Sequence, residues 1–191
     1  RQREIAVLAD PEAACISALR PDAVIDAILA KYNLGTKITD APCVIGVGPG
    51  FTAGVDCHAC VETMRGHTLG RVITDGSPIP NTNIPGLIGG FAGERVLRAP
   101  ADGVFRQLLD IGASVKQGDI AGMVGKVPMC CQIDGTLRGI LADGTPVFRG
   151  MKAGDVDPRN VREYCNLVSD KALAIGGGVL QAILRFAGGA Y

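Results

Sequence analysis

The chain has 191 residues, 47% of them hydrophobic, so one large or two small domains can form a core without disulfide bonds. Nineteen basic and nineteen acidic residues give zero formal net charge, which argues against binding nucleic acid or a membrane surface through a basic patch. Seven cysteines, an odd number, indicate a reducing cytoplasm rather than a disulfide framework, and the uncharged runs are too short and glycine-rich to span a bilayer.

The first third of the chain predicts an α/β layer. A helix is expected at Glu12–Leu19, before the break at Arg20-Pro21, and the apolar run Ala23–Leu29 fits either a buried strand or a helix. Strands are predicted at Ile5–Leu8, Cys43–Val47 and Arg71–Thr74. Because a strand-like segment follows Arg1 at once, with no Rossmann opening before it, we expect a Rossmann-like layer that is truncated at its N-terminus.

Residues 43–67 carry the strongest functional signal. The strand Cys43–Val47 leads into a glycine-rich loop, and a helix is predicted over Val55–Arg65. In α/β proteins this order exposes backbone N–H groups and a helix N-terminus to an anion. We therefore predict a phosphate-binding loop, with contacts from Gly48, Gly50, Phe51, Thr52, Ala53 and Gly54. The alternative is a tight strand-to-helix turn that binds nothing.

A row of polar side chains follows on the predicted helix. The row consists of Asp56, His58, Glu62, Arg65 and His67. His58 and Glu62 are four residues apart and would share a helix face. Such a row can bind a phosphate or supply a proton donor, and it can equally form surface ion pairs. Asp26 lies inside an apolar run, where a charged side chain needs a partner. It either contacts a ligand at the carboxyl edge of the sheet or is a capping or salt-bridged aspartate.

Cys57-x-x-Cys60 allows several interpretations. A zinc site normally needs a second pair of ligands, which the adjacent Cys130-Cys131 supplies poorly, so we predict no metal. Near a helix N-terminus, Cys57 or Cys60 would have a lowered pKa and be the nucleophile of a selenium or sulfur transfer. The remaining alternative is that both cysteines pack in the core.

The second part of the chain contains an internal repeat. Aligning Asp102-Gly103 with Asp134-Gly135 gives an offset of 134 − 102 = 32 residues. The same offset matches Arg106 with Arg138, Leu109 with Leu141, Gly112 with Gly144, Val115 with Val147, and Gly118 with Gly150. Two copies of one β unit, neither able to bury its apolar face alone, predict a pseudo-symmetric sandwich.

The segment Ala99–Ile120 resembles the biotinyl/lipoyl type of barrel-sandwich hybrid. Those carriers modify a lysine in the hairpin between the two halves, and Lys126 stands near that place. Because its neighbours are not methionines, an ordinary exposed turn lysine is favoured. The tail predicts a helix over Lys171–Phe186, capped by Ser169 or Asp170, in which Gly176–Gly178 marks close packing or a break.

These elements predict an α/β plus β fold in three parts. Residues 1–93 form the α/β layer, whose end at Gly76–Gly93 is a linker or ordered loop; residues 94–156 form the β unit; and residues 157–191 form a helical segment that packs on the α/β layer.

Four phrases of the sequence point to a family. They are VIGVGPGFTAGVDCHA (44–59), ETMRGHTLGRVI (62–73), RVLRAPADGVF (95–105) and SDKALAIGGGVL (169–180). Together they resemble the YqeB-like accessory family of the selenium-dependent molybdenum hydroxylase system, whose members usually carry a further N-terminal Rossmann-like segment. The resemblance implies a role in maturing a molybdenum hydroxylase of the xanthine dehydrogenase type.

The resemblance leaves the biochemical step open, and three alternatives follow. The chain would bind a phosphate-bearing cofactor, molybdopterin or a nucleotide, at Gly48–Gly54. Alternatively, it would transfer selenium or sulfur through Cys57 or Cys60. In the third alternative it is a scaffold that docks the hydroxylase and has no small-molecule site.

Overall fold

The computed structural model of the protein describes residues 4–82 and 86–188, and the chain divides into two compact units. The α/β unit comprises Arg1–Thr82 with Asp170–Tyr191, and the β unit comprises Asn83–Ser169. The β unit therefore extends beyond the predicted 94–156 at both ends. Within the predicted linker at residues 76–93, Ile88 and Phe91 form an isolated β-bridge, and residues 83–85 lie outside the described part.

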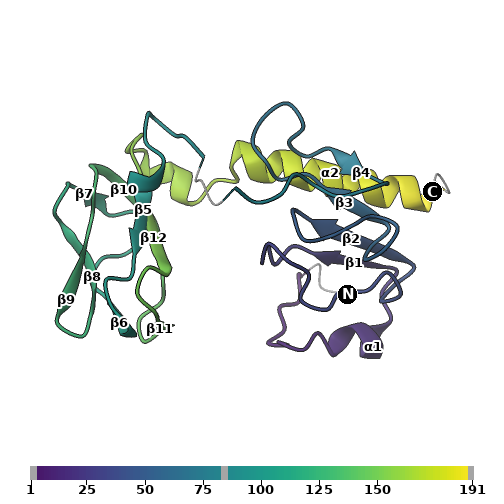
Figure 1. The fold of residues 1–191 in the computed structure, drawn as a ribbon, viewed down its shortest axis with the longest axis horizontal. Helices are drawn as coiled ribbons and strands as arrows, with labels where there is room; N and C mark the ends of the chain where they lie inside the picture. Colours follow the sequence, from purple (N-terminus) through teal and green to yellow (C-terminus); the bar gives the residue numbers. More distant parts are fainter. Residues whose placement is uncertain (1–3, 83–85, 189–191) are drawn as a thin grey trace. The chain divides into compact units, whose positions relative to one another are not determined.

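A four-stranded sheet organises the α/β unit (Figure 1). Its order is β1 (Ala23–Asp26), β2 (Cys43–Val47), β3 (Ala59–Val61) and β4 (Val72–Ile73). The first three strands are parallel, and β4 runs antiparallel to β3. Strand β2 has the predicted bounds, the ambiguous run at 23–29 is a strand, and the predicted helix at 171–186 is α2 (Asp170–Ala187).

The two faces of this sheet bury different side chains because successive residues of a strand point to opposite sides. Cys43 and Ile45 of β2 pack with Val61 of β3 against Ile175 and Ala182 of α2. Val44 and Cys60 face the other way and pack under the loop 51–57, together with Phe51, Ala53 and Cys57. The helix and the glycine-rich loop thus cover opposite faces.

Three predicted elements of this unit are wrong or too long. Residues 55–65 are not a helix, because Ala59–Val61 extends to form β3 and pairs in parallel with Ile45–Val47. Residues 5–8 are not a strand: the backbone there has no strand partner among the described residues, and the side chains are exposed. The predicted helix at 12–19 is shortened to α1 (Cys15–Leu19), which ends at Arg20 in a left-handed conformation.

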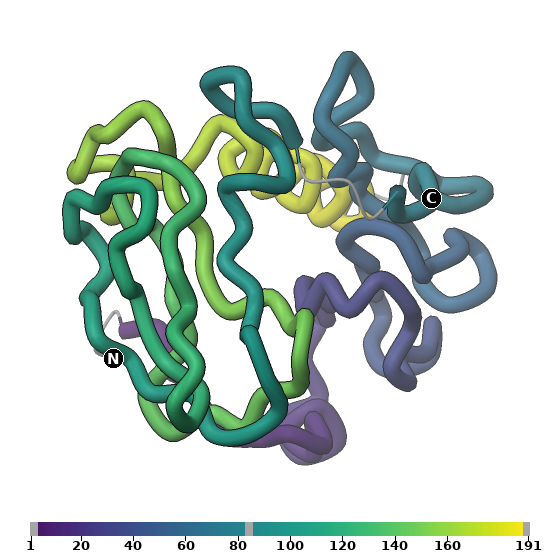
Figure 2. The backbone as a smooth tube through the Cα atoms, turned by 60° about the vertical axis from the view of Figure 1, so that its left-hand side comes forward, coloured from purple at the N-terminus to yellow at the C-terminus, as the bar shows by residue number. Residues whose placement is uncertain are grey.

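Two four-stranded antiparallel sheets form the β unit (Figure 1), and Figure 2 traces its backbone in teal to green. One has the order β5-β12-β10-β7 and the other β11-β6-β8-β9. The strands are β5 (Val96–Arg98), β6 (Gly103–Gln107), β7 (Ser114–Val115), β8 (Ile120–Val124), β9 (Val127–Cys130), β10 (Gly135–Ile140), β11 (Pro146–Val147) and β12 (Lys152–Asp157). Phe105, Leu137 and Val156 are fully buried in one core, and short 3-10 helices lie at η1 (Gly93–Arg95) and η2 (Arg162–Cys165).

The 32-residue repeat has a structural counterpart. Adding 32 moves β6 onto the start of β10, β7 onto β11, and β8 onto all but the last residue of β12. The amide of Gly112 donates to Leu137 O at 2.8 Å, and that of Gly144 donates to Phe105 O at 2.8 Å, so equivalent bonds run in both directions. The repeated aspartates do the same: Asp102 accepts the Arg149 amide, and Asp134 accepts the Gln117 amide. Each copy thus closes a turn of the other.

The finer fold types stay predictions, both the Rossmann-like layer and the barrel-sandwich hybrid. Lys126 lies, as expected, in the exposed turn between β8 and β9. By length and composition alone, the stretch Arg162–Ala187 is apolar enough to cross a membrane, a test that core helices of soluble proteins also pass.

Candidate functional site

The carboxyl edge of the parallel strands is the first place to look for a ligand, because open α/β sheets bind ligands there. Strands β1, β2 and β3 end at Asp26, Val47 and Val61. The segments that leave this edge meet at Gly48: a Cβ atom there would lie 3.0 Å from Thr63 Oγ1 and 3.3 Å from Leu29 Cδ2. All three loops are therefore in contact.

Asp26 is buried at this edge, and its carboxylate is satisfied within the chain. One oxygen accepts the Ile28 amide at 3.0 Å, and the other accepts the Thr36 hydroxyl at 2.6 Å. Asp26 therefore shapes the loop after β1, which is the capping alternative rather than the ligand alternative.

The glycine-rich loop does not expose its amides as an anion cradle. Four of them bond internally: Gly48 N to Val61 O at 2.9 Å, Thr52 N to Asp56 Oδ2 at 2.8 Å, Ala53 N to Gly76 O at 2.8 Å, and Gly54 N to Cys57 O at 2.8 Å. The Phe51 ring is buried beneath the loop, against Gly46. Since no helix follows either, the predicted phosphate cradle lacks its free amides at residues 48 and 52–54.

Gly50 keeps a role at the edge. Its φ is +108°, and a Cβ atom there would lie 2.5 Å from Tyr32 Cα. Only glycine allows this approach, so Gly50 fixes the loop after β1 against the loop after β2.

The predicted polar row is divided among separate places. Glu62 is buried after β3 and accepts the amides of Thr63, Met64 and Ile79 at 2.7–2.8 Å. His58 instead accepts the Val44 amide through Nδ1 at 3.0 Å and lies edge-on to the Phe186 ring. His67 is exposed, and Asp56 holds the loop by accepting from Thr52 and Asn33. Glu62 and His58 therefore have separate backbone partners, and no hydrogen bond or ion pair joins them among the described residues.

Lys171, in the first turn of α2, is affected electrostatically by two cations from other segments. Arg65, after β3, makes a bidentate ion pair with Asp170 at 2.7 and 3.1 Å. Burial lowers the pKa of Lys171, and the charges of Lys31 and Arg65 lower it further, against the opposite effect of Glu62. Three cations thus come from three segments of the chain. Lys171 was not among the residues predicted from sequence. A lysine in the first turn of a helix is unfavourable to the helix dipole, so its position could have marked it as a candidate for a functional role.

Cys57 and Cys60 form a close dithiol on the loop side of the sheet. Their Sγ atoms lie 3.4 Å apart, and both side chains are 0% exposed. The hydrogen bond between the two thiols lowers the pKa of Cys57, and the same contact, with burial, raises the pKa of Cys60 well above its usual value. The expected helix dipole is absent, so the asymmetry comes from the pair itself. Among residues 4–82 and 86–188, no group of three His, Cys, Asp or Glu side chains is placed to hold a metal.

Comparison with known proteins gives one strong sequence match. The chain is 49% identical over 180 residues to a protein of Escherichia coli K12 described as "Uncharacterized protein YqeB". The match covers 94% of this chain and 33% of that protein, so the chain spans about a third of the length of its relative.

No protein-family model matches the chain, and its likeness to solved structures is weak. An aspartoacylase family protein of Mesorhizobium loti is 18% identical, with a TM-score of 0.30 over 33% of this chain and 22% of that one. The ectoine utilization protein EutE of Ruegeria pomeroyi is 20% identical, with a TM-score of 0.28 over 44% and 27%. Structural likeness at this level defines no shared fold, whereas the sequence similarity supports a YqeB-like family for this chain.

Proposed function

We propose that the chain is part of a cytoplasmic accessory factor that matures a selenium-dependent molybdenum hydroxylase of the xanthine dehydrogenase type. In this proposal the carboxyl edge of the α/β sheet binds the phosphate of a molybdopterin-type cofactor or a nucleotide. Two observations support binding: Arg65 pairs with Asp170 at the start of α2, and the pKa of Lys171 is lowered by burial and by the charges of Lys31 and Arg65, from two other segments.

The charge balance of this edge favours an anion. Three cations face two carboxylates, Glu62 and Asp170, which leaves 3 − 2 = +1. The Glu62 oxygens accept hydrogen bonds from three backbone amides, and the Glu62 charge offsets only part of the effect of the cations on Lys171, whose pKa stays lowered. A phosphate would relieve the repulsion among the cations and accept charge-assisted hydrogen bonds from them. The positive end of α2 adds to this attraction.

The backbone conformation of the loop after β1 also supports an anion site at the carboxyl edge of the sheet. Leu29 and Lys31 have φ values of +61° and +74°, in the left-handed region that residues with side chains rarely adopt. Such conformations cost roughly 1–3 kcal/mol each and concentrate at functional sites. Here the strained loop is the one that carries Lys31, held in place by Gly50 against Tyr32.

Calorimetric titration with molybdopterin, and separately with ATP, tests the proposal. Replacing Lys171 by Gln should weaken binding at least about tenfold, because a charge-assisted contact is lost. Lys116→Gln is the matched control, since Lys116 is an exposed lysine paired with Asp134 in the β unit. Absence of saturable binding, or equal weakening by both substitutions, contradicts the proposal.

The Cys57–Cys60 pair supports a second candidate function, transfer of selenium or sulfur. The Cys57 thiolate would take the terminal atom from a persulfide or selenopersulfide donor and release the donor thiol. Attack of Cys60 on Cys57 Sγ would then release that atom as sulfide or selenide and leave a disulfide. An external dithiol would return the pair to its reduced form. The short Sγ–Sγ distance and the opposite pKa shifts favour these roles.

Mass spectrometry of the chain after treatment with glutathione persulfide tests the transfer. We expect one added sulfur atom on Cys57, lost in Cys57→Ser and accumulating in Cys60→Ser, which lacks the resolving thiol. Cys43→Ser is the control, since Cys43 is also buried but faces α2. Unchanged labelling of Cys57→Ser excludes this function and leaves the cofactor-binding proposal intact.

A further inference from the structure

A pocket of about 470 Å³ in the β unit is lined by residues of the paired strands β10 and β12. Its wall includes Arg138 and Gly139 of β10 and Lys152, Gly154 and Asp155 of β12. We propose that this pocket binds a small ligand through an anionic group, a phosphate or a carboxylate, held by Arg138 and Lys152. This site is separate from the edge of the α/β sheet and does not depend on the function proposed above.

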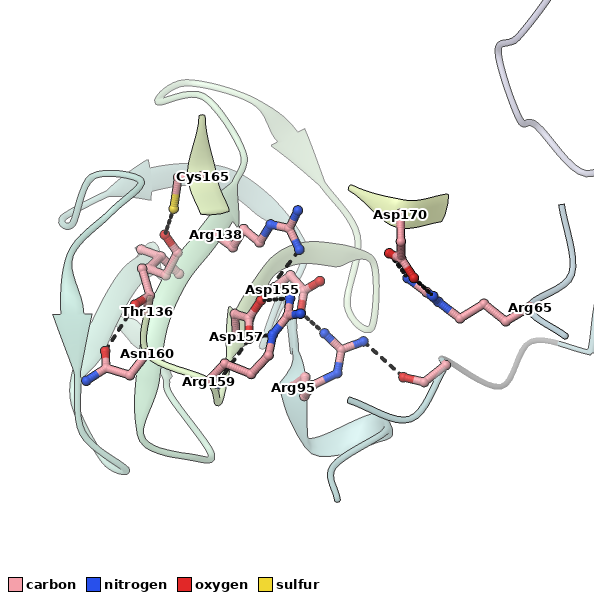
Figure 3. A network of polar contacts seen from close by, with 12 residues as sticks. Arg65, Arg95, Thr136, Arg138, Asp155, Asp157, Arg159, Asn160, Cys165 and Asp170 are labelled. Carbon is pink, nitrogen blue, oxygen red and sulfur yellow. Dashed lines mark hydrogen bonds and ion pairs between the residues drawn. The ribbon is translucent and has the colours of Figure 1, made fainter. Parts of the chain in front are cut away.

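Arg138 is available for a ligand because another arginine already neutralises its neighbour Asp157 (Figure 3). Arg159 donates to both carboxylate oxygens of Asp157, at 2.9 and 2.5 Å. The Arg138 contact with the same carboxylate is long, at 3.5 Å. Its side chain is 26% exposed and makes no other hydrogen bond within the described residues, although its charge also acts on Asp155. Most of its hydrogen-bond donors therefore remain unused on the pocket wall.

Asp155 is likewise compensated from outside the pocket. Arg95, only 8% exposed, donates to it at 2.9 Å and also bonds Gly86 O at 3.2 Å (Figure 3). Counting Arg95, Arg138, Arg159 and Lys152 against Asp155 and Asp157 gives 4 − 2 = +2. The excess positive charge belongs to the two cations that line the pocket.

The first copy of the repeat shows that the fold does not require these charges. At the 32-residue offset, Lys152 corresponds to Ile120 and Asp155 to Met123. Ile120 and Met123 lie on β8, which pairs with an antiparallel strand and has a bulge at Ala121. Strand β12 likewise pairs with an antiparallel strand and has a bulge at the equivalent Ala153. The charged pair is therefore an addition of the second copy rather than a requirement of the backbone.

The backbone at Arg138 also departs from the first copy. Its counterpart Arg106 stands in regular register with Met123. In the second copy the ladder passes from Leu137↔Val156 to Gly139↔Asp155, so Arg138 is an extra residue in a β-bulge. Bulges re-aim side chains and are over-represented beside active sites. This bulge accompanies the placement of the Arg138 guanidinium on the pocket wall.

Gly139 leaves room beside these cations. A Cβ atom at Gly139 would meet only Asp155 Cβ, at 3.9 Å, and its φ lies outside the left-handed region. A larger residue would thus fit the fold while occupying space that a ligand would use. The corresponding residue of the first copy is Gln107.

Calorimetric titration of the whole chain at low salt tests the proposal, with pyrophosphate and succinate as separate probes. We expect saturable binding of one of them, and the better probe identifies the anionic group as phosphate or carboxylate. Arg138→Gln and Lys152→Ile should each weaken it at least about tenfold, the latter by restoring the residue of the first copy. Gly139→Val should block binding without lowering the melting temperature.

Arg106→Gln is the matched control and should leave binding unchanged, as should Lys171→Gln in the α/β unit. The proposal is overturned if neither probe saturates below about 10 mM. It is equally overturned if Arg138→Gln binds normally or if Arg106→Gln weakens binding as much. Loss of binding in Lys171→Gln alone would assign the probe to the other site and overturn this one.

Discussion

Gly178 of α2 lies directly against Gly70, in the loop between β3 and β4, so that a Cβ atom on Gly178 would overlap the Gly70 carbonyl oxygen. The same loop is close to the helix at a second point, because a Cβ atom on Gly70 would overlap the carbonyl oxygen of Ala174. The helix is continuous through its three glycines. Of the two alternatives that the sequence left open, close packing is therefore the one found, and it concerns Gly178 alone.

We predict opposite effects for alanine at two neighbouring positions of α2. Gly178→Ala should destabilise the protein by about 1–3 kcal/mol, because the methyl group has no space without moving backbone. Gly177→Ala should stabilise it by about 0.5–1 kcal/mol, since nothing lies within 4 Å and alanine favours the helix. Urea unfolding monitored by circular dichroism measures both, and equal effects would contradict the packing described.

A second prediction concerns acid stability and Asp157. The hydrogen bonds from Arg159 hold the pKa of this buried carboxyl below its usual value. Such a group stabilises the fold above its unfolded pKa of about 3.9, and this contribution is lost as pH falls through the lower folded pKa. Asp157→Asn should therefore lower the free energy of unfolding by about 1–3 kcal/mol at neutral pH. It should also weaken the dependence of that free energy on pH below a pH of about 4.

Acid titration of the full chain by circular dichroism checks this second prediction. The control is Asp75→Asn, an exposed position outside the arginine network. If Asp157→Asn loses its folded signal at low pH as steeply as the wild type does, other carboxyl groups govern acid unfolding.

The elements that could be predicted are those whose sequence pattern extends over several residues. The five apolar residues of β2, the long apolar helix α2 and the 32-residue repeat were each predicted from sequence. The helix at 55–65 failed because His58, Glu62 and Arg65 have helical spacing, while β3 has only three residues and shows little alternation. Pairing with β2, a tertiary contact, decided its conformation.

The candidate site was predicted in part for a related reason. Gly50 follows a strand that was predicted and could be placed at the carboxyl edge from sequence, whereas Glu62 and Arg65 were assigned to a helix and follow β3 instead. Lys171 could not, because it reaches the edge only through the packing of α2, as the Arg65–Asp170 ion pair across 105 residues illustrates. The pocket in the β unit was not predicted. Comparing the two copies of the repeat could have indicated it, because Ile120 and Met123 of the first copy are replaced by the charged Lys152 and Asp155 in the second.

A third prediction concerns access to the buried dithiol. Asp56 anchors the covering loop by accepting from Thr52 N at 2.8 Å and Asn33 Nδ2 at 3.3 Å. Asp56→Ala removes both bonds, so the loop should open more often and Cys57 should react faster with iodoacetamide. Mass spectrometry at timed intervals measures the rate, with Cys43 as internal control. Equal acceleration at Cys43 would indicate global unfolding instead of loop opening.

The last prediction follows the charge of Lys171. Burial and the neighbouring cations lower its pKa, so the unfolded chain binds this proton more tightly. Stability should therefore rise with pH from the lowered folded pKa up to the unfolded value of about 10.4. Arg65→Gln removes one of the cations and frees Asp170, and both changes should raise the pKa of Lys171. A bound phosphate should raise it as well, because an opposite charge favours the ammonium form.

NMR titration of ¹³C-methylated lysines resolves this effect residue by residue. The pKa of Lys116, which is raised because the ammonium donates a hydrogen bond to Asp134, should stay unchanged in Arg65→Gln and in the presence of ATP. If the pKa of Lys171 moves in Arg65→Gln but not with ATP, the cation group exists without being the nucleotide site. If it moves in neither case, the three cations do not act on one another, and the electrostatic basis of the proposed site is lost.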